Sequence, residues 1–168
     1  MNTNAQDSPD AVNAATDHRA EPPPESQVGN SQALLAAIRK ITHIEDLEFD
    51  ADGDISLQRG TQMVNVRLPE NAQLVRIWSP LLRSVGDSTK LLVRLNRLNM
   101  GTSSVRFCFL GGVIFAEAVV DARPLLVEHI KNALRRFGDA TDGLDALLQG
   151  EFGGFTAAPG VAASVRVH

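Results

Sequence analysis

The sequence has a single cysteine, Cys108, and no hydrophobic run long enough to cross a membrane. A lone cysteine excludes an intramolecular disulfide framework and is typical of proteins in a reducing compartment. A membrane-spanning helix needs about 20 predominantly apolar residues, so no membrane association is expected. The N-terminus also lacks the basic and apolar regions of a secretory signal. Together these absences predict a cytoplasmic protein.

Beyond the first thirty residues, the chain has no excess of charge of either sign. The sequence carries 20 acidic and 16 basic residues, and five of the acids but only one of the bases fall in the first thirty residues. The remaining chain is therefore formally neutral, which disfavours a nucleic-acid interface. The basic pairs Arg94/Arg97 and Arg135/Arg136 are interpreted as solvated helix faces.

No combination of residues typical of a catalytic or metal site is found. The four histidines form no His-x-x-x-His motif, so a structural zinc lacks ligands. To act as a nucleophile, Cys108 would need a cationic neighbour that stabilises its thiolate. The residue expected opposite it on the neighbouring strand is Phe115, so Cys108 is interpreted as a small apolar side chain that fills space. Asp139, Asp142 and Asp145 follow a helical spacing, which indicates a solvated face more than a divalent cation site. We expect no catalytic residue, metal or cofactor.

Composition divides the chain into three parts. Residues 1–30 contain the sequence PPPE, many small and polar residues and almost no large apolar side chains, and we expect an acidic, disordered tail. Residues 31–152 form one domain, long enough to bury a core. Residues 153–168 contain two pairs of turn-forming residues, Gly153-Gly154 and Pro159-Gly160, and are expected to form a flexible C-terminal tail.

The first half of the domain predicts a helix followed by short strands. Asn30 or Ser31 can cap a helix that ends near His43, because apolar residues recur there at helical spacing. Alternating patterns then predict antiparallel strands with one buried face. These strands are Leu47–Asp50, Ile55–Gln58 and Met63–Leu68, with a further strand over Leu74–Trp78 in which Val75 and Ile77 point inward and which Pro80 ends.

The second half predicts a helix, a hairpin and a long helix. Asp87 or Ser88 can cap the helix, and Gly101 can end it. The last helix begins at Pro124 and is expected to bend or break near Phe137-Gly138. The fold class is therefore α+β: an antiparallel sheet of about five strands with helices packed on it, in the order α-β-β-β-(β)-α-β-β-α.

The hairpin predicts which residues lie opposite each other, because Gly111-Gly112 forms a two-residue loop. Leu110 then faces Val113, and the same register places Arg106 opposite Glu117, a pair of opposite charges. Alternation sends one set of side chains to the core under the helices: Val105, Phe107, Phe109, Ile114, Ala116, Ala118 and Val120.

The opposite face of the hairpin is expected to be unusually apolar. Arg106 and Glu117 lie at one end of this face, and the other end carries Cys108, Leu110, Val113 and Phe115. A contiguous apolar patch on the solvent side of a sheet is typical of a partner surface. The alternatives are that the C-terminal tail or a loop covers it, or that it forms a dimer contact. The residues predicted to bind a partner are these six together with Trp78.

Four segments resemble those of the YbjN-like proteins, and more broadly of the type III secretion chaperone-like superfamily. They are LVRLNRLNMG at Leu92–Gly101, RFCFLGGVIFAEA at Arg106–Ala118, HIKNALRRFGDATDGLD at His129–Asp145 and EFGG at Glu151–Gly154. The resemblance covers roughly Ser31–Gly154. It implies an acidic cytosolic protein that tends to dimerise and holds a segment of another polypeptide against its sheet or helices, without catalytic residues.

The leading hypothesis is a non-enzymatic chaperone or adaptor that captures a peptide segment of a client protein. The segment would either add as a strand to an exposed sheet edge or place apolar side chains on the outer patch. The alternative is a regulatory or sensory domain that binds a small molecule between its sheet and helices. The partners expected are a client protein and a second copy of the chain.

Overall fold

The computed structural model describes residues 25–60, 62–69 and 73–156, which form one antiparallel sheet with four helices. The strand order is β1-β2-β3-β5-β4, and β6 pairs with the end of β3. The elements are α1 (Glu25–Thr42), β1 (Ile55–Arg59), β2 (Gln62–Arg67), β3 (Leu74–Arg83), α2 (Thr89–Gly101), β4 (Arg106–Leu110), β5 (Val113–Asp121), α3 (Val127–Thr141), α4 (Leu144–Phe152) and β6 (Phe155–Thr156).

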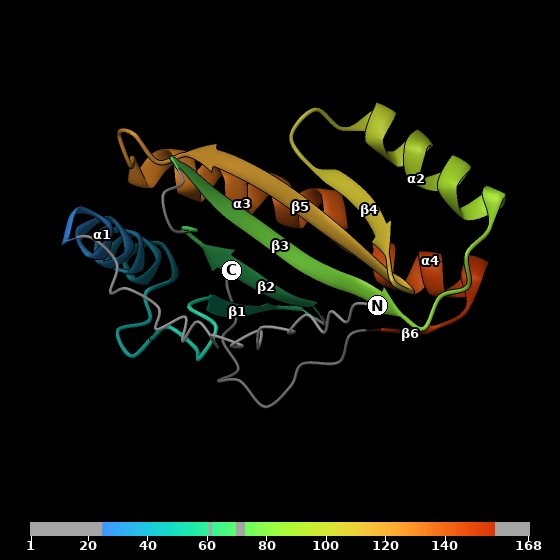
Figure 1. Cartoon of the computed structure of the whole chain (residues 1–168), viewed down its shortest axis with the longest axis horizontal. Coiled ribbons are helices and arrows are strands. Elements are labelled where there is room, and N and C mark those ends of the chain that lie inside the picture. The colour runs from blue at the N-terminus through green and yellow to red at the C-terminus, as the bar shows by residue number, and fades with distance from the viewer. Residues whose placement is uncertain (1–24, 61, 70–72, 157–168) are drawn as a thin grey trace, which may run out of the picture.

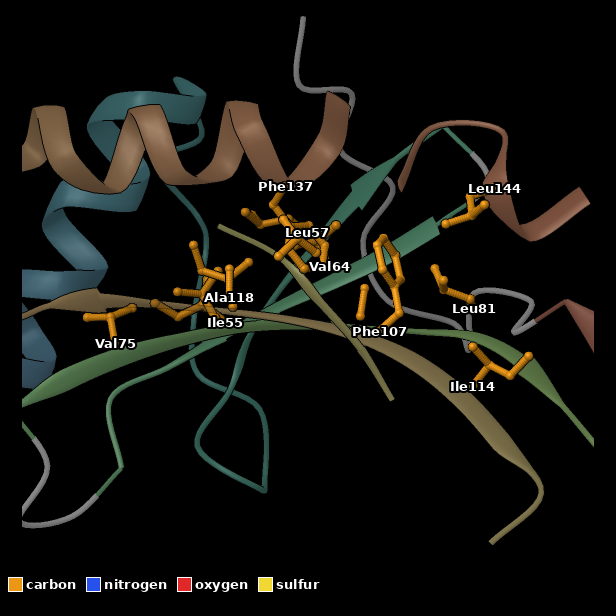
Figure 2. Close-up of a cluster of buried hydrophobic side chains, with 14 of the residues drawn as sticks. Ile55, Leu57, Val64, Val75, Leu81, Phe107, Ile114, Ala118, Phe137 and Leu144 are labelled. Carbon is orange, nitrogen blue, oxygen red and sulfur yellow. The ribbon is translucent and has the colours of Figure 1, made fainter. Parts of the chain in front are cut away.

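The helices cover one face of the sheet, which confirms the predicted α+β class. In Figure 1, α3 runs behind β3 and β5, with α1 and α4 towards its two ends and α2 beside β4. Figure 2 shows Phe137 of α3 directed towards Leu57 and Val64 in the sheet. Leu91 and Leu95 of α2 also join this core. The other face of the sheet carries no described helix.

The predicted hairpin register is confirmed pair by pair. Leu110 lies opposite Val113, Cys108 opposite Phe115 and Arg106 opposite Glu117. Gly111 and Gly112 have φ values of +58° and +79°, the left-handed conformation that a two-residue loop requires at both positions. The alternation follows from this register, and the predicted core-facing residues are buried or packed against the core.

Two strand predictions are wrong. Leu47–Asp50 forms no strand, because the Leu47 carbonyl accepts two hydrogen bonds from the Arg39 guanidinium, at 3.1 and 2.7 Å, and is tied to α1. The strand at Leu74 exists, with Val75 and Ile77 inward as predicted, but it continues past Pro80 to Arg83. Pro80 is tolerated because the pairing with β5 shifts register between Pro80 and Leu82.

The helix boundaries also differ in part from prediction. Ser88 caps α2 as expected, accepting a hydrogen bond from the Leu91 amide at 3.2 Å, but α1 begins at Glu25 rather than at Asn30. The helix predicted to begin at Pro124 is α3, which begins at Val127. The helix breaks at Gly143, where φ is +68°, and not at Gly138.

Gly138 has a packing role inside α3 instead. A Cβ at this position would collide with the Arg59 guanidinium, which lies against the helix backbone and donates to the Leu134 carbonyl at 3.2 Å. Glycine here allows a close approach between β1 and α3 without ending the helix.

The two predicted tails lie largely outside the described residues. Residues 1–24 and 157–168 are not described, and residues 25–30 belong to α1. The chain remains part of the sheet as far as Thr156, because Phe155 pairs with Arg83 and Thr156 with Leu82.

Asn99 joins α2 to the edge of the sheet. Its side-chain amide accepts from the Phe107 N–H at 2.7 Å and donates to the Phe107 carbonyl at 3.0 Å, and the Thr102 hydroxyl donates to the Val105 carbonyl at 2.5 Å. The Asn99 amide therefore supplies the hydrogen bonds that a neighbouring strand would otherwise make with the Phe107 backbone of β4.

Replacing Asn99 by alanine is expected to lower the free energy of unfolding by about 1–2 kcal/mol, because two hydrogen bonds to the β4 backbone are lost. Urea denaturation measures this change. Asn96→Ala is the matched control, since Asn96 is exposed on the same helix and no side-chain hydrogen bond is found for it in the described ranges. Equal stabilities of the two variants would contradict this role of Asn99.

Candidate partner-binding face

All seven residues predicted to bind a partner lie on the outer face of the sheet or on the hairpin at its end. The pairing of β3, β5 and β4 aligns Trp78, Glu117 and Arg106 in one row across the strands. The next row towards the hairpin is formed by Pro80, Phe115 and Cys108. Leu110 and Val113 close the hairpin beyond this row. The outer face is thus divided into a polar row and an apolar region.

The charges of the polar row pair differently from the prediction. Arg106 and Glu117 are cross-strand neighbours as expected, but Glu117 forms its ion pair with Arg76 of β3, at 2.6 Å. The Arg76 guanidinium also lies 5.8 Å from the centre of the Trp78 ring, within reach of a cation–π interaction. Arg106 is exposed, and no ion pair is found for it in the described part of the chain. The strand alternation that points Val75 and Ile77 inward also predicts an outward Arg76, but no local pattern indicates its contacts with Glu117 and Trp78.

The apolar region is accessible to a partner. Leu110 is 73% exposed, whereas Cys108, Val113 and Phe115 are half-buried. Half-buried side chains that project from a rigid sheet lose little conformational freedom when a partner covers them. The geometry therefore suits contact with apolar side chains, with Arg106 and Glu117 available at the border to orient them.

Exposed apolar residues on α2 were not singled out by the sequence analysis. Leu92, Val93 and Met100 are all exposed, the last to 80%. From the helical spacing of its leucines, Leu92 is predicted to share an apolar core stripe with Leu91, Leu95 and Leu98. Only Leu91 and Leu95 of this helix are buried. The sequence does indicate such exposure, because this helix has more apolar residues than a single core-facing stripe can bury.

A buried ion pair lies at the start of β1. The Asp54 side chain is 5% exposed and accepts two hydrogen bonds from Arg67 of β2, both at 2.7 Å. The hydrogen bond to this carboxylate raises the pKa of the Arg67 guanidinium. It fixes the β1–β2 hairpin and lies apart from the partner-binding residues.

No helix in the described ranges has the length and apolar character needed to cross a bilayer. Among the same residues, no group of three or more His, Cys, Asp and Glu side chains is arranged to hold a metal ion.

A family model supplies the comparison with known proteins. The model described as "T3SS (YopN, CesT) and YbjN peptide-binding chaperone 1" matches residues 30–160. No curated protein matches the sequence.

Solved structures show the same fold at low identity. The HopA1–SchA chaperone–effector complex contains a chain with a TM-score of 0.60 and 12% identity, and the match covers 74% of this chain and 99% of that one. A chain of the ExsC–ExsE complex gives 0.56 and 21%, covering 73% and 94%. YbjN from E. coli gives 0.51 and 11%, covering 70% and 91%. These likenesses establish the type III secretion chaperone-like fold.

Proposed function

Because this chain belongs to the family of type III secretion and YbjN peptide-binding chaperones, we propose that it captures a segment of a client polypeptide on the outer face of its sheet. The single observation that carries this assignment is the apolar region formed by Leu110, Val113, Phe115 and Cys108. This region borders the polar row, and no described helix covers this face of the sheet. An apolar patch of this kind stabilises a complex when a partner removes it from water.

A second copy of the chain is the other partner that we propose. The exposed side chains of α2, Leu92, Val93 and Met100, form an apolar surface at the β4 side of the molecule. Burial of these residues between two copies would leave the centre of the outer face free for a client. We place this dimer in the cytoplasm, in keeping with the single reduced cysteine.

The small-molecule alternative receives less support. A ligand in the interior of the core would need space where Phe137, Leu57 and Ile77 now pack in one buried cluster. A binding protein needs no catalytic group, and we assign none to this chain.

The experiment that tests the proposal is purification under native conditions followed by mass spectrometry of any polypeptide that remains bound. Trp78 is the only tryptophan, and the chain has no tyrosine, so its fluorescence reports directly on the outer face. Addition of the recovered client should shift the Trp78 emission to shorter wavelength. A protein that retains no polypeptide from its own host, or a client that leaves this emission unchanged, would contradict the proposal.

Leu110→Asp is expected to weaken client binding by about tenfold or more, because a charge replaces an apolar contact at an interface. Leu110 is 73% exposed, so the substitution should leave the unfolding transition unchanged. Leu147→Asp on α4 is the control: Leu147 is also exposed, at 47%, but lies away from the outer face. Equal losses of affinity in both variants, measured by fluorescence titration, would argue against a site on the hairpin.

A further inference from the structure

Strand β5 is longer than its neighbour β4. Residues of β4 pair with β5 only from Val113 to Glu117, whereas β5 continues to Asp121 along β3. Figure 1 shows this step: β4 turns away towards α2, and the far half of β5 continues with β3 on its other side and α3 behind it. Residues 118–121 therefore have a strand neighbour on one side only.

The direction of the backbone groups at this step follows from two independent contacts. Asn99 binds both the N–H and the carbonyl of Phe107, so these groups point away from β5. The Ala122 N–H donates to the Gln73 carbonyl at 2.7 Å, so Ala122 points towards the β3 side. Alternation along an antiparallel strand then directs the N–H and carbonyl of Val119 and of Asp121 away from β3, into the step.

The step opens into a groove beside α3. Its cavity volume is about 320 Å³, and its lining includes Ser104, Val119, Asp121, His129, Asn132 and Arg136. The last three follow one another along a single face of α3, and the guanidinium of Arg136 has no ion pair within the described ranges. In that part of the chain, no hydrogen bond is found for the backbone groups of Val119 and Asp121 that point into the groove.

The free edges of β4 and β3 are less receptive to an added strand. The Asn99 and Thr102 side chains already occupy the β4 edge at Phe107 and Val105. Beyond Trp78, the free edge of β3 contains Pro80, which has no N–H to donate, and then pairs with β6. The β5 step instead offers two donors and two acceptors in a row beside a polar helix face.

We propose that this groove binds an extended, acidic segment of the client. The segment adds to β5 as a strand, beyond the point where β4 begins at Arg106. The proposal rests on the proposed function and specifies one of its contacts. Every second side chain of an added strand would face α3, where Arg136, His129 and Asn132 favour glutamate or aspartate. Asp121 is the one acidic residue of the lining, and it is the last residue of β5.

Two synthetic peptides of opposite charge test the proposal without knowledge of the client. The first is acetyl-Gly-Glu-Val-Glu-Val-Glu-Gly-amide, and the second has lysine in place of glutamate. Titration to millimolar peptide should shift the NMR amide signals of Val119 and Asp121, and the glutamate peptide should bind about tenfold more tightly than the lysine peptide. If both peptides bind equally, if neither moves these signals, or if the outward-facing amides of Ser56 and Gln58 in β1 shift instead, the proposal is wrong.

Val119→Pro and Val119→Ala separate the backbone contact from the side chain. Proline removes the N–H that points into the groove without removing a hydrogen bond to β3. The affinity of the Val119→Pro variant for the glutamate peptide should therefore fall about tenfold. Alanine keeps the N–H and should stay within about twofold of the native protein. A proline variant that binds like the native protein overturns the proposal.

Arg136→Glu provides a second test at an exposed position that does not threaten the fold. It should reverse the preference between the two peptides, and an unchanged preference would overturn the assignment of the charge to Arg136. The native client distinguishes a failure of the groove from a failure of the proposed function. If Val119→Pro retains the full amount of client seen with the native protein, the groove is wrong and the proposed function stands. If the native protein retains no client, the proposed function itself fails.

Discussion

Phe107→Asp is expected to unfold the protein. The Phe107 side chain is 2% exposed and packs in the core beneath the helices, as Figure 2 shows. Loss of a buried aromatic ring alone costs about 3–5 kcal/mol, and a buried carboxylate adds several more. A typical domain has about 5–15 kcal/mol of stability in total, so most or all of it would be lost. Circular dichroism during thermal unfolding measures the effect.

Phe115→Asp is the matched variant on the opposite face of the same hairpin. Phe115 is half-buried and lies opposite Cys108 on the outer face, so a charge there remains in contact with water. The cooperative thermal transition should persist, whereas client capture should be abolished. Loss of the thermal transition in this variant would mean that Phe115 belongs to the core and that the two faces were assigned the wrong way round.

Arg67→Met is expected to destabilise the protein by about 2–3 kcal/mol, because it leaves the buried Asp54 carboxylate without its partner. Arg76→Met removes an ion pair of similar length, 2.6 Å, but Glu117 is 26% exposed and water can replace the contact. The second variant should cost no more than about 1 kcal/mol. Urea denaturation of both proteins compares an ion pair with a buried carboxylate to one with a partly exposed carboxylate in the same sheet.

The double variant Asp54→Ala with Arg67→Met identifies the cause of the loss. If the unpaired carboxylate is responsible, the double variant should be more stable than Arg67→Met alone. If the double variant is equally unstable, the loss comes from the aliphatic part of Arg67 packing against the hairpin.

The hairpin register was predictable because it depends on adjacent residues. Two glycines fix a two-residue loop, and alternation then assigns each side chain to a face without information from the rest of the chain. The same local reasoning found the Ser88 cap and the strands at Ile55 and Met63. The outer-face position of the predicted partner-binding residues follows from this register, and their role in binding stays a prediction.

Contacts between distant residues explain the predictions that failed. Leu47–Asp50 resembles a strand in sequence, but Arg39 of α1 binds the Leu47 carbonyl. Gly138 resembles a helix break, but its lack of a side chain accommodates Arg59 from a strand almost eighty residues earlier. Local propensity cannot anticipate such contacts, because they form only when the whole sheet is assembled.

The groove at the β5 step shows the same limit for the functional site. The groove exists because β5 pairs with β3 as far as Asp121, whereas β4 pairs with β5 only as far as Glu117. No local sequence pattern specifies the pairing of β5 with β3. Arg136 was interpreted from sequence as part of a solvated helix face. It is exposed, but the fold places it beside an open strand edge.

The row arrangement of the outer face also makes the native protein a ready spectroscopic tool. Trp78 and Cys108 are the only indole and the only thiol in the chain, and they lie in adjacent rows on β3 and β4, separated by β5. A nitroxide or dye attached to the thiol would therefore quench the indole emission in the unmodified sequence. Because the two positions are fixed by the sheet, any change in that quenching would arise from a molecule arriving between them.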